Sequence, residues 1–391
     1  MRPHDFRDRR SFPGLEGGPF ELLVTWAERI DRIPDPVFAL LLLIPASLFG
    51  WAVAWDRALV GVYALGDWIL LAALPRRRIS FGPPKAPTLL LLLLRLPFAL
   101  LPFPAHLALQ SAGTVLVIYG FWIEPQQLGV TRQRLRSSKL DGRPSLRMVH
   151  FGDLHMERST ERDRRLVSII HSLQPDVILF SGDFLSYSCV QDPEAWAAAR
   201  QIFAALSAPL GVFAVSGSPP VDPEDVVAQI LEGTHVRWLR DERVSLRRGP
   251  APIDLVGLGC THKPYLDAPR LAALTVCPPE NFTILLYHSP DLAPHAAECG
   301  IDLQLSGHTH GGQVRLPFFG AIYPSSLYGK RLEVGRRQLG ATTLYVTRGL
   351  GLEGKGAPRV RFLSRPEVTL WEIGGSESGP AGSSSQRPSR D

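Results

Sequence analysis

Acidic and histidine side chains recur along the second half of this 391-residue chain in an order that suits the binding of two divalent cations. The candidate ligands are Asp153, His155, Asp183, His288, His308 and His310. Two cations that cleave a phosphoester lie about 3.5–4 Å apart and need one carboxylate that reaches both. Asp183 suits this bridging position because Gly182 lets the backbone turn immediately before it. The pattern predicts a binuclear centre, with Asp153 and Asp183 as its catalytic carboxylates.

The elements that must position these side chains follow an α/β pattern from Leu146 onward. Strand-like apolar runs are Met148–Phe151, Val177–Phe180, Val212–Val215, Ile253–Val256, Thr283–Tyr287 and Leu303–Leu305. Apolar residues recur at helical spacing from Leu166 to Leu173, and Ala197 to Leu206 offers a second helix. The candidate ligands each follow one of these strands. Because loops at the carboxyl ends of sheet strands converge, residues distant in sequence are expected to meet there.

Several phrases of the chain carry a likeness to a known family. They are HFGDLHME, LFSGDF, LLYHSPD, LSGHTHGGQVRLP and LYVTRGLG, with IEPQQLGV ahead of them. The chain resembles the calcineurin-like metallophosphoesterases, and within them the bacterial membrane-tethered branch, from about Ile123 to Ile373. The resemblance implies a four-layer αββα sandwich. It also implies two ligand sets: Asp153, His155, Asp183 and His310 around one metal, and Asp183, His288 and His308 around the other.

The chain departs from this family at one motif. Members carry a GNH run after the third strand, whose Asn ligates the second metal and whose His serves the transition state or the leaving oxygen. Here the run reads Gly217-Ser218-Pro219, and the only Asn of the chain is Asn281. Ser218 offers a neutral oxygen, which is a poorer ligand, and Pro219 can do no proton chemistry. The second metal is therefore expected to bind more weakly.

Three consequences of this departure stay open. In the first, the substrate is one whose leaving group needs no protonation, such as a phosphoanhydride. In the second, other groups substitute, with Asp222 completing the second metal's shell and His262 acting as the acid. In the third, catalysis is lost. In the first two cases a hydroxide held between the ions attacks phosphorus in line. In the last the protein is a membrane-anchored binding or regulatory protein on a phosphoesterase scaffold. Mixed oxygen and nitrogen ligands favour Mn²⁺, with Fe or Zn²⁺ as alternatives.

The first third of the chain is apolar enough for membrane helices. Four stretches approach the roughly 20 residues that cross a bilayer: Val37–Trp55, Ala58–Leu74, Thr88–Phe103 and Ala105–Ile123. The second contains Asp67, and the third contains Arg95 and two prolines, so either is alternatively re-entrant or packed against its neighbours. An α-helical transmembrane region of about four helices is therefore predicted ahead of the sandwich.

Basic residues border the apolar stretches. Arginines precede the first stretch, Arg76 to Lys85 separates two of them, and Arg132 to Lys139 follows the last. With four spans all three lie on one side, which the positive-inside rule makes cytoplasmic. We therefore expect a multi-pass protein of the inner or plasma membrane with its catalytic domain facing the cytoplasm. The expected partners are the lipid bilayer and a phosphate-containing small molecule or lipid. No basic stripe interleaved with aromatics predicts nucleic-acid binding, in spite of the net charge of +5.

These observations divide the chain into five predicted regions. They are a polar basic leader (1–36), the transmembrane region (37–123), a membrane-proximal linker (124–145), the metallophosphoesterase domain (146–373) and a disordered tail (374–391). Within the domain, Thr343–Thr347 and Glu367–Ile373 are expected to complete a second sheet. The four cysteines show no CxxC spacing and are interpreted as free thiols in a reducing compartment.

Overall fold

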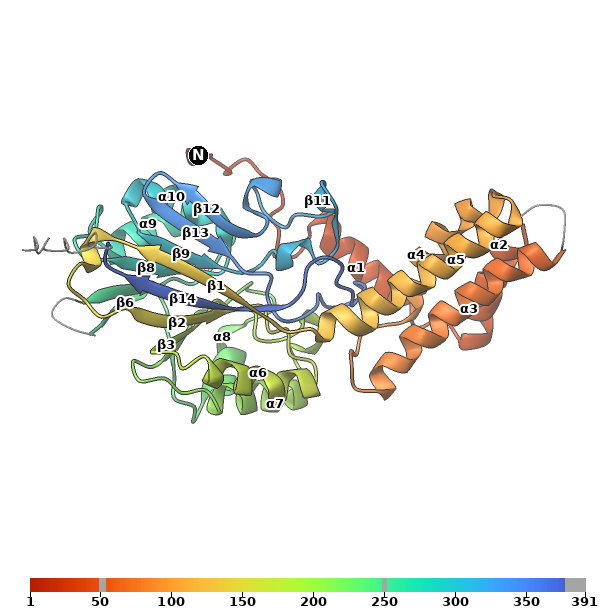
Figure 1. Cartoon of the computed structure of the whole chain (residues 1–391), viewed down its shortest axis with the longest axis horizontal. Coiled ribbons are helices and arrows are strands. Elements are labelled where there is room, and N and C mark those ends of the chain that lie inside the picture. The colour runs from red at the N-terminus through yellow and green to blue at the C-terminus, as the bar shows by residue number, and fades with distance from the viewer. Residues whose placement is uncertain (49–53, 248–251, 377–391) are drawn as a thin grey trace, which may run out of the picture.

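A sandwich of two sheets carries a helical bundle that projects from one end of it (Figure 1). The computed structural model describes residues 1–48, 54–247 and 252–376. Short 3₁₀ helices lie at Glu124–Gln126, Ser138–Leu140, Tyr187–Cys189, Pro290–Leu292, His310–Gly312 and Gly329–Leu332.

The first sheet has six strands in the order β1-β14-β2-β3-β4-β5. Their bounds are β1 Gly129–Arg136, β14 Glu367–Gly374, β2 Leu146–Phe151, β3 Val177–Phe180, β4 Val212–Ala214 and β5 Val236–Trp238. Strands β2 to β5 are parallel, so their carboxyl ends share one edge. The predicted strands over β2, β3 and β4 are confirmed.

The second sheet has the order β12-β13-β9-β8-β7-β6. Its strands are β12 Gly335–Leu339, β13 Thr342–Val346, β9 Leu303–Ser306, β8 Thr283–Leu286, β7 Ile253–Gly257 and β6 Glu242–Leu246. Strands β7, β8, β9 and β13 are parallel. A small hairpin, β10 (Arg315–Leu316) and β11 (Gly320–Ala321), stands apart from both sheets.

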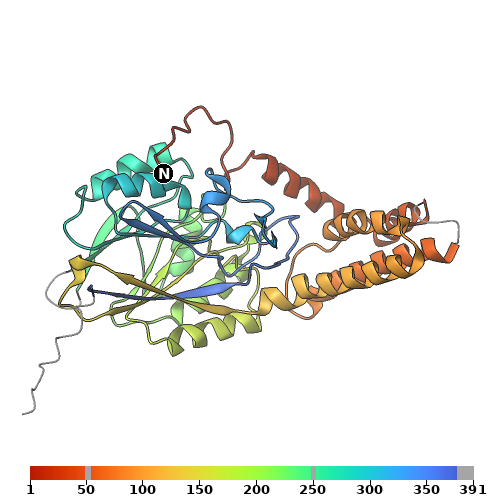
Figure 2. The same cartoon turned by 45° about the horizontal axis from the view of Figure 1, so that its top comes forward.

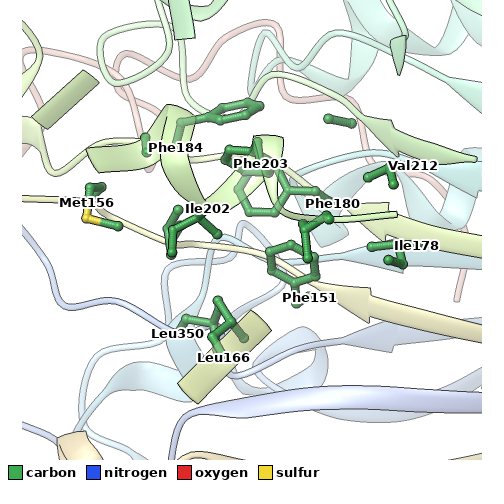
Figure 3. Packing of buried hydrophobic residues seen from close by; sticks show 14 of the residues in the cluster. Phe151, Met156, Leu166, Ile178, Phe180, Phe184, Ile202, Phe203, Val212 and Leu350 are labelled. Carbon is green, nitrogen blue, oxygen red and sulfur yellow. The ribbon is translucent and has the colours of Figure 1, made fainter. Parts of the chain in front are cut away.

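Helices cover the outer face of each sheet, which gives the predicted αββα order of layers (Figure 1). Helices α6 (Glu161–Ser172), α7 (Pro193–Ala204) and α8 (Glu224–Leu231) pack on the first sheet, and α9 (Pro264–Leu274) and α10 (Ala293–Cys299) on the second. Figure 3 shows the first of these layers, where the rings of Phe180, Phe184 and Phe203 contact one another in edge-to-face and tilted arrangements, with centroids 4.6–5.0 Å apart. Alternation along β2 explains the arrangement, because Met148 faces the second sheet while Val149 and Phe151 face the helices.

Two predicted assignments within the sandwich need correction. The segment Glu367–Ile373 lies in the first sheet, between β1 and β2, because Trp371 fills the space between the sheets while Leu370 packs under the helices. The segment 124–145, expected as a linker, contains β1, whose eight residues pair with β14 in parallel. The chain therefore passes from the helices before residue 124 directly into a strand of the first sheet.

The cysteines also differ from expectation. Cys277 and Cys299 form a disulfide, whereas Cys189 and Cys260 are free. Position in sequence could not show this, because 22 residues separate the two partners and α10 brings them together. The predicted disordered tail lies outside the described residues from position 377 on, and Gly374 still belongs to β14.

The bundle consists of α2 (Asp35–Leu48), α3 (Ala54–Arg76), α4 (Lys85–Arg95) and α5 (Phe103–Ile118). The chain runs out and back twice, so the 77–84 turn lies beside the sandwich. Among the described residues, Ala58–Arg76 and Phe103–Gln126 are long and apolar enough to cross a membrane. The stretch Val37–Trp55 includes positions 49–53, which lie outside the described residues. The stretch Thr88–Phe103 changes after Arg95 into a 3₁₀ helix, Leu96–Leu100, which contains Pro97.

The N-terminal leader is partly helical and partly buried against the sandwich. It contains α1 (Pro19–Ile30), and its first 18 residues run across the sandwich towards the carboxyl ends of the strands (Figures 1 and 2). Phe6 and Phe12 are buried in this contact, where Phe6 packs on Tyr328 and Phe12 on Tyr265.

Candidate metal centre

The candidate ligands meet at the edge where the parallel strands of both sheets end. Asp153 follows β2, Asp183 follows β3 and Ser218 follows β4, while His262, His288 and His308 follow β7, β8 and β9. All of them are buried. Backbone strain marks this edge, since thirteen described non-glycine residues have a positive φ and six of them are Asp153, His155, Asp183, His262, His308 and His310. Such strained conformations concentrate at functional sites because the surrounding structure must hold them in place.

One group of ligand atoms matches the predicted first set. It contains Asp153, His155, Asp183 and His310, whose ligand atoms all lie within 4.8 Å of one another. The Nε2 atoms of His155 and His310 are 2.9 Å apart, and His155 Nε2 is 3.4 Å from Asp183 Oδ2. Four donors of mixed oxygen and nitrogen type thus point at one position, as a cation site requires.

A second group contains three imidazoles, those of His262, His288 and His308. The ring centroids are 4.4 Å apart for His262 and His308, and 5.3 Å apart for His288 and His308. Asp183 connects the two groups, because its Oδ2 atom lies 3.3 Å from His288 Nε2 as well as near His155. Sequence reasoning gave His262 the role of an acid, and the structure places it among the candidate ligands.

Buried polar atoms test whether cations fit these groups. Among the described residues, no hydrogen-bond partner contacts Asp153 Oδ2 or His308 Nε2, although both atoms are fully covered. Burying such an atom without a partner costs about 1–3 kcal/mol, which a coordinated cation would offset. The second Asp153 oxygen accepts the His308 backbone N–H at 2.7 Å, which leaves Oδ2 for a ligand role. The residues present fit two divalent cations.

The electrostatics of the centre keep His308 and Asp183 unprotonated but favour a proton on His288. Burial lowers the pKa of His308 to about 3, so its imidazole is neutral and can bind a metal. Burial raises the pKa of Asp183, but the charges of His288 and His155 outweigh it and hold the pKa below its usual range. For His288, burial lowers the pKa while the Asp183 carboxylate raises it to about 9 in the absence of a cation. A bound cation would replace that proton.

Comparisons with known proteins were made for the whole chain. No family model matches it. The chain is 30% identical over 269 residues to the uncharacterised metallophosphoesterase YkuE of Bacillus subtilis, a match that covers 65% of this chain and 88% of that protein. The chain belongs to the metallophosphoesterases. It is also 28% identical to the UDP-2,3-diacylglucosamine pyrophosphatase LpxG of Chlamydia trachomatis, over 68% of this chain and 95% of that one.

Another relative and a solved structure are also similar to this metallophosphoesterase. The phosphodiesterase YaeI of Escherichia coli is 27% identical over 67% of this chain and 96% of its own length. Among solved structures, the Thermus thermophilus protein TT1561 aligns over 53% of this chain and 91% of its own, with 13% identity and a TM-score of 0.36.

The altered motif of this metallophosphoesterase is held in a fixed position. The Ser218 backbone N–H donates to Asp183 Oδ1 at 2.7 Å, so the run still orients the carboxylate that lies between the two groups. Asp222 accepts the backbone N–H groups of Gly217, Asp183 and Phe184 at 2.6–2.9 Å. Within the described chain neither ligand group contains Asp222, and its contacts make it a support for the loops. The Ser218 hydroxyl lies 3.0 Å from His262 Nε2 and 3.4 Å from His288 Nε2.

The leader closes the solvent side of the centre, which sequence reasoning missed. Residues Pro13 to Glu16 line a small pocket with Asp183, Ser218 and His308. A Cβ atom on Gly14 would lie 2.5 Å from His262 Nε2 and 2.9 Å from His308 Cε1, so only glycine fits there. The Tyr187 hydroxyl donates to Glu16 at 2.8 Å and holds the segment down. Gly14 has a φ of +82°, a conformation that favours glycine. The glycine itself is visible in the sequence, but the conformation that requires it is not.

An apolar cavity of about 660 Å³ adjoins the small pocket beside the leader, since Tyr323 and Ser325 line both. Its walls are Leu90 and Leu94 of α4, Leu109 and Leu116 of α5, and Ile322 after the small hairpin. His310 lines the same cavity. A continuous apolar surface therefore extends from the outer bundle, where Leu90, Leu94 and Leu116 are exposed, to a ligand of the first group.

Proposed function

We propose that this metallophosphoesterase is a membrane-anchored hydrolase that cleaves a phosphodiester or pyrophosphate bond in a lipid-linked substrate. The observation that carries the lipid part of the proposal is the cavity, which joins the apolar bundle to His310. A charged phosphate group would bind at the centre while an acyl chain lies between α4, α5 and Ile322. This chain is similar to LpxG, whose name describes cleavage of a diacylated pyrophosphate.

Two sets of residues would hold the two cations of the proposed centre. Asp153, His155, Asp183 and His310 would hold one cation, and Asp183, His288 and His308 the other. When bound, the cations supply a hydroxide nucleophile and positive charge at the phosphoryl oxygens, and Mn²⁺, Fe or Zn²⁺ suits the donor set. Asp183 would belong to both sets of ligands, and the Ser218 N–H fixes its second oxygen, Oδ1.

The altered motif favours a pyrophosphate over a simple ester of an alcohol. Hydrolysis breaks a phosphorus–oxygen bond, and the departing oxygen takes the electron pair of that bond. An alkoxide needs a proton at that moment, whereas a phosphate group leaves as a stabilised anion. Pro219 stands where family members place a histidine and cannot donate a proton. A phosphoanhydride substrate needs no such donor.

We further propose that four passes anchor the chain and that the domain faces the cytoplasm. The leader and the 77–84 turn both contact the sandwich: the Tyr187 hydroxyl donates to Glu16 of the leader at 2.8 Å, and Ile79 of the turn lines a small pocket with His155 and Met156. The basic residues that border the bundle therefore share one side, which the positive-inside rule makes cytoplasmic.

The disulfide provides a test of this orientation. The two sulfurs are close enough to form the bond, but a reducing cytoplasm would keep the pair as thiols, because disulfides are rare in reducing compartments. Rapid alkylation of intact cells, followed by mass analysis, should show Cys277 and Cys299 modified if the domain is cytoplasmic. Unmodified, bonded sulfurs would place the domain on the oxidising side and refute the proposed orientation.

The hydrolase itself is tested with the full chain reconstituted in vesicles with Mn²⁺. Release of phosphate product from a diacyl pyrophosphate lipid is expected for the native chain and absent for Asp183→Asn. The exposed Asp225→Asn is the matched control and should retain the native rate. Equal rates for Asp183→Asn and the native chain would refute the hydrolase. Bound metal without turnover would instead favour a binding or regulatory protein, for which the Ser218-Pro219 replacement is the supporting observation.

The cavity is tested by filling it. Leu116→Trp places an indole on the cavity wall, whereas Val115→Trp places the same group on the exposed, neighbouring position outside it. We expect Leu116→Trp to lower kcat/KM for the diacyl substrate and to leave a water-soluble pyrophosphate unaffected. Identical behaviour of the two tryptophan variants would show that the acyl chain binds elsewhere.

A further inference from the structure

We infer that His262 replaces the missing asparagine as a direct ligand of the second cation. The inference rests on the proposed binuclear centre and names a ligand that the family pattern does not contain at this position. In the family pattern the Asn comes from the loop after the third strand, on the first sheet. Here the replacing nitrogen comes from the loop after β7, on the second sheet.

The geometry shows that His262 reaches the place that Ser218 leaves open. Its Nε2 atom is 3.0 Å from the Ser218 hydroxyl. The imidazole therefore reaches the end of the serine side chain, which is shorter than the asparagine of the family pattern. The same residue belongs to the group with His288 and His308 whose ligand atoms lie within 4.8 Å of one another. Serine is therefore small enough to let a histidine from the opposite sheet enter the centre.

His262 shares the unusual backbone conformation of the other candidate ligands. Its φ is +59°, close to that of Asp183 at +59° and His308 at +70°, and its side chain is buried. A histidine held in a left-handed conformation and turned into a polar centre gains nothing from core packing. The strain instead aims its imidazole at His308, 4.4 Å away between ring centroids.

A buried carboxylate fixes the loop that carries His262. Asp267 of α9 accepts the Thr261 backbone N–H at 3.0 Å and the Thr261 hydroxyl at 2.9 Å. It also accepts the Tyr287 hydroxyl at 2.6 Å and pairs with Arg270 at 2.7 Å. Tyr287 directly precedes His288, so one carboxylate positions the neighbours of two ligands. Such outer partners are characteristic of metal sites, where they fix the orientation of the ligating rings.

The exchange has a consequence for metal choice. With Asp183, the second site would offer three imidazole nitrogens and one carboxylate. Imidazole suits Zn²⁺ and Fe, whereas carbonyl and carboxylate oxygens suit Mn²⁺. The second site should therefore bind Zn²⁺ more tightly than Mn²⁺, and the first site, with its two aspartates, should discriminate less.

The test measures metal binding to the full, detergent-purified chain and does not depend on turnover. After chelation and reloading with Zn²⁺, elemental analysis should find two ions per native chain and one in His262→Ala. The affinity for the second ion should fall by at least about 100-fold, since even outer-shell changes cost 10–100-fold. The exposed His235→Ala should keep both ions.

A compensating variant decides between a ligand and a merely structural histidine. Ser218→Asn restores the family ligand, so Ser218→Asn/His262→Ala should regain the second ion, with a preference shifted towards Mn²⁺. Asp267→Asn should weaken the second site by about 10–100-fold and leave the first unchanged. Two ions of native affinity in His262→Ala would overturn the inference, and so would loss of both ions, because the first group does not include His262. A chain that binds two ions but hydrolyses nothing would refute the proposed function alone.

Discussion

The helical bundle contains a buried ion pair whose removal should destabilise the whole protein. Arg95 of α4 donates to both oxygens of Asp67 of α3, at 2.6 and 2.8 Å, and the two side chains are 5% and 1% exposed. Its remaining N–H groups donate to Gln110 and Thr114 of α5. All three helices are thus joined through one guanidinium group. We consider the variant Asp67→Leu.

The structure sets the size of the effect. Asp67→Leu removes two charge-assisted hydrogen bonds and leaves a positive charge without a counter-ion in an apolar setting. Breaking a buried pair by removing one partner costs about 3–5 kcal/mol. That loss changes the ratio of folded to unfolded protein by roughly two to four orders of magnitude. Asp67→Leu/Arg95→Met removes both charges, so only the polar atoms of Gln110 and Thr114 lose a partner, at about 1–3 kcal/mol.

Urea unfolding in mild detergent, followed by tryptophan fluorescence, measures these free energies. The double variant should be more stable than either single variant, which is the signature of a coupled pair. Arg134→Ala is the matched control, because the Arg134–Glu372 pair is 76% and 38% exposed and should contribute under about 1 kcal/mol. If Asp67→Leu costs no more than this control, Arg95 is solvated and the bundle is not packed as described.

Three further changes have defined outcomes. Gly14→Val should lift the leader off His262 and raise turnover of a soluble chromogenic phosphodiester, whereas Gly17→Val, also at positive φ but with open space around it, should not. Adding Mn²⁺ to chelated protein at 100 times its dissociation constant should stabilise the fold by about 2.7 kcal/mol in thermal unfolding, and Asp183→Asn should lose most of that gain. Burial lowers the pKa of His150 to about 3, so the unfolded chain alone takes up this proton below about pH 6.5. Stability should therefore fall as pH drops from about 6.5 towards 3, by up to roughly 1.4 kcal/mol per unit, and unfolding midpoints of His150→Gln should lack this slope.

The sequence predicted those parts of the centre that depend on strand ends. Asp153, Asp183, His288 and His308 could be placed because each directly follows an apolar run, and parallel strands bring such positions to one edge. His155 and His310 followed from their short spacing to these residues. The alternation of apolar runs with helical periodicity indicated an α/β fold, whereas the four-layer order was implied by the resemblance to the metallophosphoesterases.

The rest depended on contacts between distant segments. His262 stands five residues after β7, in a loop whose direction is set by Asp267 on the following helix. Gly14 and Glu16 reach the centre only because the leader folds back across the sandwich, and the leader's polar composition does not indicate this. The position of β14 was wrong because its residues are apolar on both faces, which a sequence cannot assign to one sheet or the other.

A short path of hydrogen bonds connects the helical bundle with the candidate metal centre. Helix α5 continues through Tyr119–Ile123 to Glu124, whose carboxylate accepts the backbone N–H groups of Leu363 and Ser364 at 2.9 and 2.6 Å. The Ser364 hydroxyl in turn donates to the carbonyl of His310 at 2.8 Å. Since α5 also forms a wall of the cavity, its position relative to the sandwich affects both the shape of the cavity and the placement of His310. A fragment that begins after Glu124 would lose one wall of the cavity and the hydrogen bonds that lead from Glu124 to His310, so the bundle contributes both to the cavity and to the support of a candidate ligand.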